Sequence, residues 1–588
     1  MRPSSLTFRG LTTAVLFVLG SALGPASATA QSPTGVLNAI PADAIGFAVV
    51  HNFGGASQSI DDLAKLVQAP APNLLGLAKQ VTGLQKGLDD EGDLAIVLTS
   101  IAPAPKVVAL APVANFADFF AALHAESSAT GIVEVQLAGA SALVGRKGGY
   151  AAIARAEDRD ALEKLLASPT NLAADAALAT WIDANQVSFV LTAQGVKQLL
   201  PKLTSGVRAA QAQLRQIGEA NGQPAASALD LYVNLFTAAE AEVEQFGLGL
   251  RIDAARTVDL VKRVQFAPGG AWAKWAADAK PAAEDLFAGF PAEPFVMALG
   301  AVVPQGATDS WMKLSLQLMQ NQAQFELTPE QAQKYVELSA QAMQGVRSMR
   351  MLLGVAAPEA GFYGNTSAVM TVDDAPRYLE RYEQSLAAMR ELALETKSPL
   401  IPTATSQRIK IGETEALEVS MTLPQMKQLT TQGGPDMQRM MELMFGAQGE
   451  LKIYVAAADA HSVVMAYTSP ERLKAALDFY RSKQPGLSRD AGVAKVAAAL
   501  PAGSQVVAYV SLGGVAKAAK QFATMFPGGQ SVIPDFADSP PFGIAAKVSP
   551  AGAEGHLVVT AETLRVIGAA VAKARGAAPA PGPKAPSR

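Results

Sequence analysis

The chain contains no cysteine, only four histidines and few aromatic residues, which make up 6% of its 588 residues. The lack of cysteine excludes disulfide bonds, cysteine-ligated zinc or iron–sulfur centres and a cysteine nucleophile. Charged residues are also scarce, at 17%, and their balance leaves a net charge of −4. Because phosphate contacts need a concentrated basic surface, this balance argues against nucleic acid as a partner. With 49% hydrophobic residues, the chain reads as a folded protein and not as an intrinsically disordered one.

Motifs for catalysis and metal binding are missing as well. The four histidines are too far apart in sequence for a helical metal pair, and we expect each to be a polar surface or turn residue: His51, His124, His461 and His556. No GxSxG, Walker A or HExxH pattern occurs. We therefore predict no catalytic residues, no metal and no cofactor. A cofactor-free hydrolase stays open as the alternative, because paired carboxylates come together only in the fold.

One acidic run, at residues 89–93, raises the question of calcium. It lacks the alternating ligand spacing and the terminal glutamate of an EF-hand loop. Directly after it comes the apolar segment Leu94–Leu98, which has the composition of a strand. The run therefore favours an Asp/Gly-rich turn before that strand over a metal site.

The N-terminus has the pattern of a secretory signal. Arg2 and Arg9 precede an apolar segment at residues 11–23, and Ala28-Thr29-Ala30 forms a small-x-small cleavage site. The rival interpretation is a retained membrane anchor, but the apolar segment is shorter than the roughly 20 residues that span a bilayer. We predict cleavage near Ala30, no integral membrane span in the mature chain, and a periplasmic or secreted location.

Internal repetition is the most informative feature. Residues 185–200 align without a gap with residues 504–519, so that Gln186 falls on Gln505. Later in each copy, Phe246-Gly247 and Phe542-Gly543 open similar pairs of strand-like segments. Since further segments match in the same order, we predict two homologous halves.

Short β segments in adjacent pairs, separated by single helices, favour antiparallel hairpins. The predicted fold class is therefore α+β, with antiparallel or mixed twisted sheets covered by helices; a doubly wound α/β fold is the alternative. The predicted organisation is a signal peptide at 1–30, a linker at 31–37, repeat halves at 38–289 and 290–574, with a Met/Gln-rich insertion at 396–448 in the second, and a disordered Pro/Ala-rich tail at 575–588.

Helix starts can also be read from the sequence. Thr328-Pro329-Glu330-Gln331 resembles a capping box, and Ser469 before Pro470 has the pattern of an N-cap followed by a first-turn proline. Asp158 is expected at the corresponding N-cap in the first half.

Methionine is concentrated in one region. Of 17 methionines, 14 lie between Met297 and Met444. Four of them follow a spacing of i, i+3, i+4, i+7 and so share one helix face: Met437, Met440, Met441 and Met444. This face could be ordinary core, an adaptable surface for an apolar peptide or lipid, or a soft-metal site. We predict that it is partly exposed and covers or lines a groove that holds an apolar peptide or lipid.

The chain resembles an uncharacterised family of exported, planctomycete-type bacterial proteins. The resemblance is based on the N-terminal export signal, on Pro41-Ala42-Asp43 at the start of a strand, and on the turn residues Gly87-Leu88-Asp89 and Gly92-Asp93. The resemblance implies no activity and no functional residues. The predicted function is therefore a non-catalytic exported protein that acts in binding or envelope assembly, with an unknown protein or an apolar ligand as its partner.

Overall fold

The computed structural model describes residues 35–69, 73–82, 84–125, 131–220, 227–304, 327–396, 403–422, 434–445, 451–524 and 533–576. The predicted signal peptide and nearly all of the predicted tail lie outside these ranges. The chain forms two compact units. The first contains residues 1–202, 240–267 and 554–588, and the second contains residues 203–239 and 268–553. These units interleave in sequence, because residues 554–588 return to the first unit, and so their limits differ from the predicted halves.

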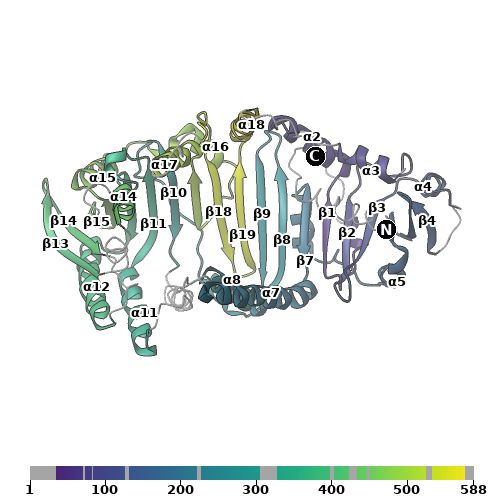
Figure 1. The fold of residues 1–588 in the computed structure, drawn as a ribbon, viewed down its shortest axis with the longest axis horizontal. Helices are drawn as coiled ribbons and strands as arrows, with labels where there is room; N and C mark the ends of the chain where they lie inside the picture. The colour runs from purple at the N-terminus through teal and green to yellow at the C-terminus, as the bar shows by residue number, and fades with distance from the viewer. Residues whose placement is uncertain are drawn as a thin grey trace, which may run out of the picture. The chain divides into compact units, whose positions relative to one another are not determined.

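The sheet of the first unit is antiparallel throughout its described pairs. In spatial order its strands are β4 (Val133–Leu137), β5 (Ala140–Lys147), β6 (Tyr150–Arg155), β3 (Lys106–Pro112), β2 (Leu94–Ser100), β1 (Gly46–Val50), β7 (Val187–Leu191), β8 (Val243–Ile252), β9 (Val258–Phe266) and β19 (Gly552–Val559). Figure 1 shows β7, β8 and β9 side by side.

The second unit contains a sheet of the same kind. Its order is β13 (Thr403–Ile411), β14 (Thr414–Thr422), β15 (Leu451–Ala457), β16 (Ser462–Tyr467), β12 (Thr366–Val372), β11 (Val346–Gly354), β10 (Phe295–Val302), β17 (Val506–Val510) and β18 (Phe542–Ser549). Every strand pair described within either unit is antiparallel, and helices accompany both sheets. The α+β prediction is confirmed.

The two sheets share a strand order from β4 to β8 and from β14 to β18, and the second sheet has β13 in addition, next to β14. The corresponding strand pairs also share a register. In the first unit Val187 of β7 is opposite Leu250 of β8, and in the second Val506 of β17 is opposite Ala546 of β18. At the other end of the same pairs, Leu191 is opposite Phe246 and Val510 is opposite Phe542. The segments that align in sequence therefore occupy the same positions in their sheets.

Some of the helices of the first unit cover one face of its sheet. The helices of this unit are η1 (Val36–Asn38), α2 (Phe53–Leu66), α3 (Leu74–Thr82), α4 (Phe116–Ala122), η2 (Ala156–Asp158), α5 (Arg159–Ala167), α6 (Ala176–Asp183), the first part of α7 (Ala193–Ala220) and α18 (Ala561–Gly576). Phe47, Val97 and Val190 lie opposite one another on β1, β2 and β7 and are buried. They form one core with Leu162 of α5 and Trp181 of α6. This face is therefore closed by η1, α5 and α6.

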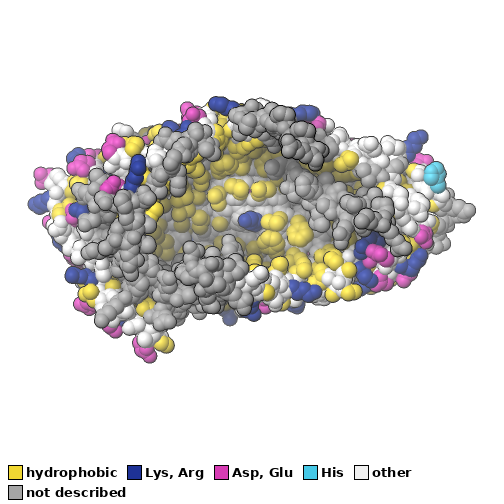
Figure 2. All heavy atoms as spheres, in the orientation of Figure 1, with side chains coloured by type: hydrophobic (Ala, Val, Ile, Leu, Met, Phe, Trp, Pro, Cys, Tyr) yellow, Lys and Arg dark blue, Asp and Glu magenta, His cyan; other side chains and the backbone are white. Residues whose placement is uncertain are grey.

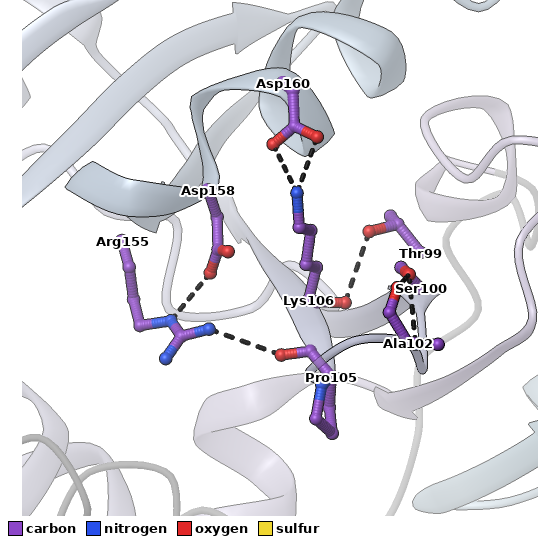
Figure 3. A network of polar contacts seen from close by, with 8 residues as sticks. All are labelled: Thr99, Ser100, Ala102, Pro105, Lys106, Arg155, Asp158 and Asp160. Carbon is purple, nitrogen blue, oxygen red and sulfur yellow. Dashed lines mark hydrogen bonds and ion pairs between the residues drawn. The ribbon is translucent and has the colours of Figure 1, made fainter.

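The start of α5 is held by charged side chains, as Figure 3 shows. Lys106 at the start of β3 donates to both oxygens of Asp160, at 2.7 and 2.6 Å. Arg155 at the end of β6 donates to Asp158 at 2.6 Å and to the carbonyl of Pro105 at 3.3 Å. Asp158 has the predicted N-cap position, but its side chain makes no capping hydrogen bond and pairs with Arg155 instead.

The helices of the second unit are the rest of α7, α8 (Ser227–Glu242) up to residue 239, α9 (Ala271–Ala277), α11 (Pro329–Met343), η3 (Pro358–Ala360), α12 (Ala375–Thr396), α14 (Gly434–Phe445), α15 (Pro470–Ser482), η4 (Leu487–Arg489), α16 (Ala491–Ala497) and α17 (Leu512–Ala523). A buried core joins Tyr378 of α12 to Val419, Val455 and Val463 of the sheet. The predicted insertion at 396–448 contains the β13–β14 hairpin and α14.

Within the described ranges, no helix is both long enough and apolar enough to cross a membrane.

Candidate apolar binding site

The second face of the first sheet is covered only in part, by α4 over β4 to β6 and by α2 and α3 further along. Helix α2 begins at Asn52, whose side chain accepts from the Gly55 N–H at 2.9 Å. Asn52 has φ 46°, in the left-handed region that asparagine tolerates better than most residues. The chain turns sharply there, between the end of β1 and the helix, and so lays α2 back along the sheet.

The acidic run at 89–93 supports this turn. The Phe53 N–H donates to the Gly92 carbonyl at 3.0 Å, and the Gly54 N–H donates to the Asp90 carbonyl at 2.6 Å. The Asn52 N–H donates to Asp93 Oδ1 at 3.0 Å. These bonds satisfy backbone donors at a helix start, which have no partner inside the helix. Among the described residues no group of three or more His, Asp or Glu side chains could hold a metal ion.

A cavity of about 270 Å³ lies between these two helices and the sheet. Its walls are almost entirely aliphatic. They comprise Phe53, Ile60, Leu74, Leu75, Leu77 and Ala78 from the helices, Leu84 and Leu88 from the following segment, and Ala48, Val50, Leu94, Ile96, Ala109, Ala111, Pro112, Leu137, Ile153 and Val187 from the strands. Four polar residues complete the lining: Ser57, Thr82, Asp89 and Asp90.

The polar side chains of the lining are mostly engaged. Lys79 Nζ lies 2.5 Å from Asp90 Oδ2, and Asp90 Oδ1 is buried without a hydrogen-bond partner in the described structure. Ser57 Oγ donates to Asn73 at 3.2 Å and accepts from the Leu75 N–H at 2.9 Å, which ties α2 to α3. The lining therefore offers a long apolar wall with almost no polar surface.

This lining favours binding over hydrolysis. Asp89 Oδ1 accepts from the Glu91 N–H at 3.2 Å, so this carboxylate holds the turn together. Asp90 is neutralised by Lys79. A carboxylate pair for hydrolysis needs one group kept protonated and one kept charged in facing positions. Both carboxylates here have structural partners among the described residues.

A second polar cluster lies where β1 ends. His51 Nδ1 lies 2.8 Å from Asp93 Oδ1, and both side chains are largely buried. The bond to Asp93 raises the pKa of His51, although burial acts in the opposite direction. Burial raises the pKa of the nearby Asp183 carboxyl, at the end of α6, and the charge of Asp93 adds to this effect while His51 opposes it. The cluster therefore links the start of α2 to the turn that supports it.

The predicted methionine face lies in the other unit. Met440, Met441 and Met444 are half-buried on α14, whereas the side chain of Met437 lies outside the described residues. The C-terminal end of α14 is docked, because the Phe362 N–H donates to the Leu443 carbonyl at 2.7 Å. No methionine is among the described residues that line the cavity. The groove proposed for this face stays a prediction.

The histidine prediction is wrong for His556. Its side chain is buried in β19, and Nδ1 lies 2.9 Å from Asp259 Oδ2 on β9. The partner is 297 residues away in sequence, so no local pattern could have shown the pair.

The cavity could not be predicted from the sequence for a related reason. The apolar periodicity of α2 and α3 shows which face they bury, but a gap beneath them depends on how side chains from distant strands fill the space.

No family model, no curated protein and no solved structure matches the chain. The resemblance to exported planctomycete-type proteins stays a prediction.

Proposed function

We propose that the first unit binds an apolar or amphipathic small molecule in the cavity beneath α2 and α3, without catalysis. The observation that carries this proposal is the cavity itself, with its almost unbroken aliphatic wall. Protein interiors are normally packed to the density of organic crystals, so a gap of this size is unusual. Apolar cavities of about 150 Å³ already bind a single aromatic ring. A volume of 270 Å³ is large enough for part of an alkyl chain or for a larger ring system.

The energetics favour a chain-like ligand. Each methylene group transferred from water into an apolar site contributes about 0.8 kcal/mol. About ten methylene groups would contribute about 8 kcal/mol before the loss of translational freedom is subtracted, so a long chain is favoured over a short one.

Two further proposals set this function in context. The N-terminal segment 1–30 supports export to the periplasm or the exterior. The shared strand order and register of the two sheets support an internal duplication. An exported binding protein of this kind needs neither metal nor cofactor.

A fluorescence titration tests the binding. N-phenyl-1-naphthylamine, which brightens in apolar sites, is added to the purified chain and to two variants. Ala109→Phe places a ring into the cavity, whereas Ala368→Phe makes the same change at the corresponding position of β12, away from it. The two alanines are matched, because both are half-buried and each lies between two large apolar residues of the neighbouring strands. Ala109 is opposite Ile96 and Ile153. Ala368 is opposite Met351 and Met465.

We expect saturable brightening in the parent chain and in Ala368→Phe, and at least a tenfold loss of affinity in Ala109→Phe. Equal binding by both variants, with folding confirmed by circular dichroism, would show that the cavity is not the site.

A further inference from the structure

The wall of the cavity continues along the sheet beyond α2 and α3. Ala48 lines the cavity, and its neighbour on β7 is Phe189. Phe189 is in turn opposite Leu248 on β8, and Leu248 is opposite Lys262 on β9. Residues directly opposite one another in antiparallel strands point to the same face of a sheet. These four side chains therefore form one row that starts in the cavity and runs across three further strands.

Most of this row is open to solvent. Phe189 is 42% exposed, Leu248 is 41% exposed and Leu260, one row further along β9, is 40% exposed. Large apolar side chains at such exposure, next to one another on one face, are uncommon on a monomeric protein and mark interaction sites. Figure 2 shows hydrophobic side chains gathered over β8 and β9, with a basic side chain among them.

The row ends in a positive charge. Lys262 is exposed and has no ion-pair partner among the described residues. The acidic residue nearest to it on β9, Asp259, belongs to the other face, where it contacts His556 and Arg251. An ammonium group at the end of an apolar row is complementary to an anionic headgroup on an apolar tail.

We propose that the ligand is a long-chain anionic amphiphile, such as a fatty acid, whose tail enters the cavity and whose headgroup binds Lys262. This inference rests on the proposed function and names the class of its ligand. Adjacent strands lie about 4.8 Å apart, so Lys262 and Ala48 are separated by roughly 15 Å across three strand spacings. An extended hexadecanoate tail exceeds this distance and reaches the cavity. An octanoate tail is too short to occupy the cavity and reach Lys262 together.

Calorimetric titration with two soluble probes tests the headgroup. Hexadecanoate and hexadecyltrimethylammonium have the same tail and opposite charge, and both are used below their aggregation concentrations. The variant is Lys262→Glu, and the control is Lys547→Glu, which makes the same change at an exposed lysine of β18 in the other unit. We expect the parent chain and Lys547→Glu to prefer hexadecanoate, and Lys262→Glu to bind it at least fivefold more weakly and to prefer the cation. Octanoate binding should be weak and insensitive to Lys262→Glu.

The outcomes separate this inference from the function on which it rests. If Ala109→Phe abolishes binding of both probes while Lys262→Glu changes neither, the cavity binds ligand and the headgroup assignment is wrong. If Lys262→Glu weakens hexadecanoate binding but Ala109→Phe does not, the headgroup assignment stands and the cavity is not where the tail lies. If the parent chain binds the two probes equally, the preference for an anion is refuted.

Discussion

Gln186 and Ile252 exchange two hydrogen bonds through the glutamine side chain. The Ile252 N–H donates to Gln186 Oε1 at 2.8 Å, and Gln186 Nε2 donates to the Ile252 carbonyl at 3.1 Å. In the second unit Gln505 makes the same pair with Val548, at 2.8 and 3.0 Å. In each sheet the side-chain amide therefore imitates a backbone peptide and extends the ladder beyond the end of a short strand.

This relationship predicts matched local effects. Gln186→Ala and Gln505→Ala each leave a backbone N–H and a carbonyl without these partners, which costs about 1–3 kcal/mol. Hydrogen exchange should rise at β7 and β8 in the first variant and at β17 and β18 in the second. The exposed Gln407, whose side chain donates to Glu418, provides a control whose replacement by alanine leaves both regions protected. Faster exchange in only one of the two variants would contradict the equivalence of the two glutamines.

Two adjacent glycines of α17 should respond in opposite ways to alanine. A Cβ at Gly514 would overlap the Phe295 carbonyl, whereas a Cβ at Gly513 meets nothing within 4 Å. Gly514→Ala should therefore cost at least about 1–3 kcal/mol through overpacking. Gly513→Ala should stabilise the helix by up to about 1 kcal/mol, because alanine is the better helix former. Thermal unfolding of both variants measures the difference, and equal melting temperatures would mean that α17 does not approach β10 so closely.

The cluster at His51 predicts a pH dependence. The pKa of His51 is raised, so its contribution to stability is complete below the unfolded pKa of about 6.5 and is lost as the pH rises through the folded value. The pKa of Asp183 is raised too, so the penalty for its charge appears as the pH rises. The penalty of Asp183 begins near its unfolded pKa of about 4, whereas the window near neutral pH belongs to His51, so the first unit should be less stable at about pH 8 than at about pH 6.

Replacing His51 by glutamine should reduce this slope. Exchange rates of the α2 amides measured at several pH values, corrected for intrinsic exchange, provide the readout. His124→Gln is the control, since His124 is exposed and lies in a turn of the same unit. A slope that is unchanged in His51→Gln, or lost equally in His124→Gln, would exclude the His51 cluster as its source.

The methionine face gives a prediction that separates the two candidate sites. Replacing Met440, Met441 and Met444 by serine should loosen α14 and leave binding of N-phenyl-1-naphthylamine unchanged, because the cavity belongs to the first unit. Leucine at the same three positions should preserve both, since leucine and methionine have similar volumes. Loss of probe binding in the serine variant alone would move the ligand site to α14.

Local signals in the sequence were sufficient for caps and for the fold class. Thr328 and Gln331 form the predicted capping box, and Ser469 accepts from the Arg472 N–H as a helix N-cap. Such contacts join residues three positions apart, so a short pattern contains all the information. Alternation of apolar residues and short turns likewise indicated antiparallel strands.

The site could not be predicted in this way. The cavity wall combines Ala48, Ala109, Ile153 and Val187, which come together only through the order of the strands. The row from Ala48 to Lys262 depends on the register of three strand pairs. The high density of methionine, by contrast, is visible in the sequence and indicates a binding face on α14.

The most direct test of the central claim is a crystal structure with hexadecanoate that carries bromine on its terminal carbon. The bromine gives an anomalous signal that locates the end of the tail without ambiguity. The account predicts a peak beneath α2, between Ile60 and Ala109 on the cavity wall. A peak against Met440, Met441 and Met444, or a bound probe with no bromine in the first unit, would contradict it.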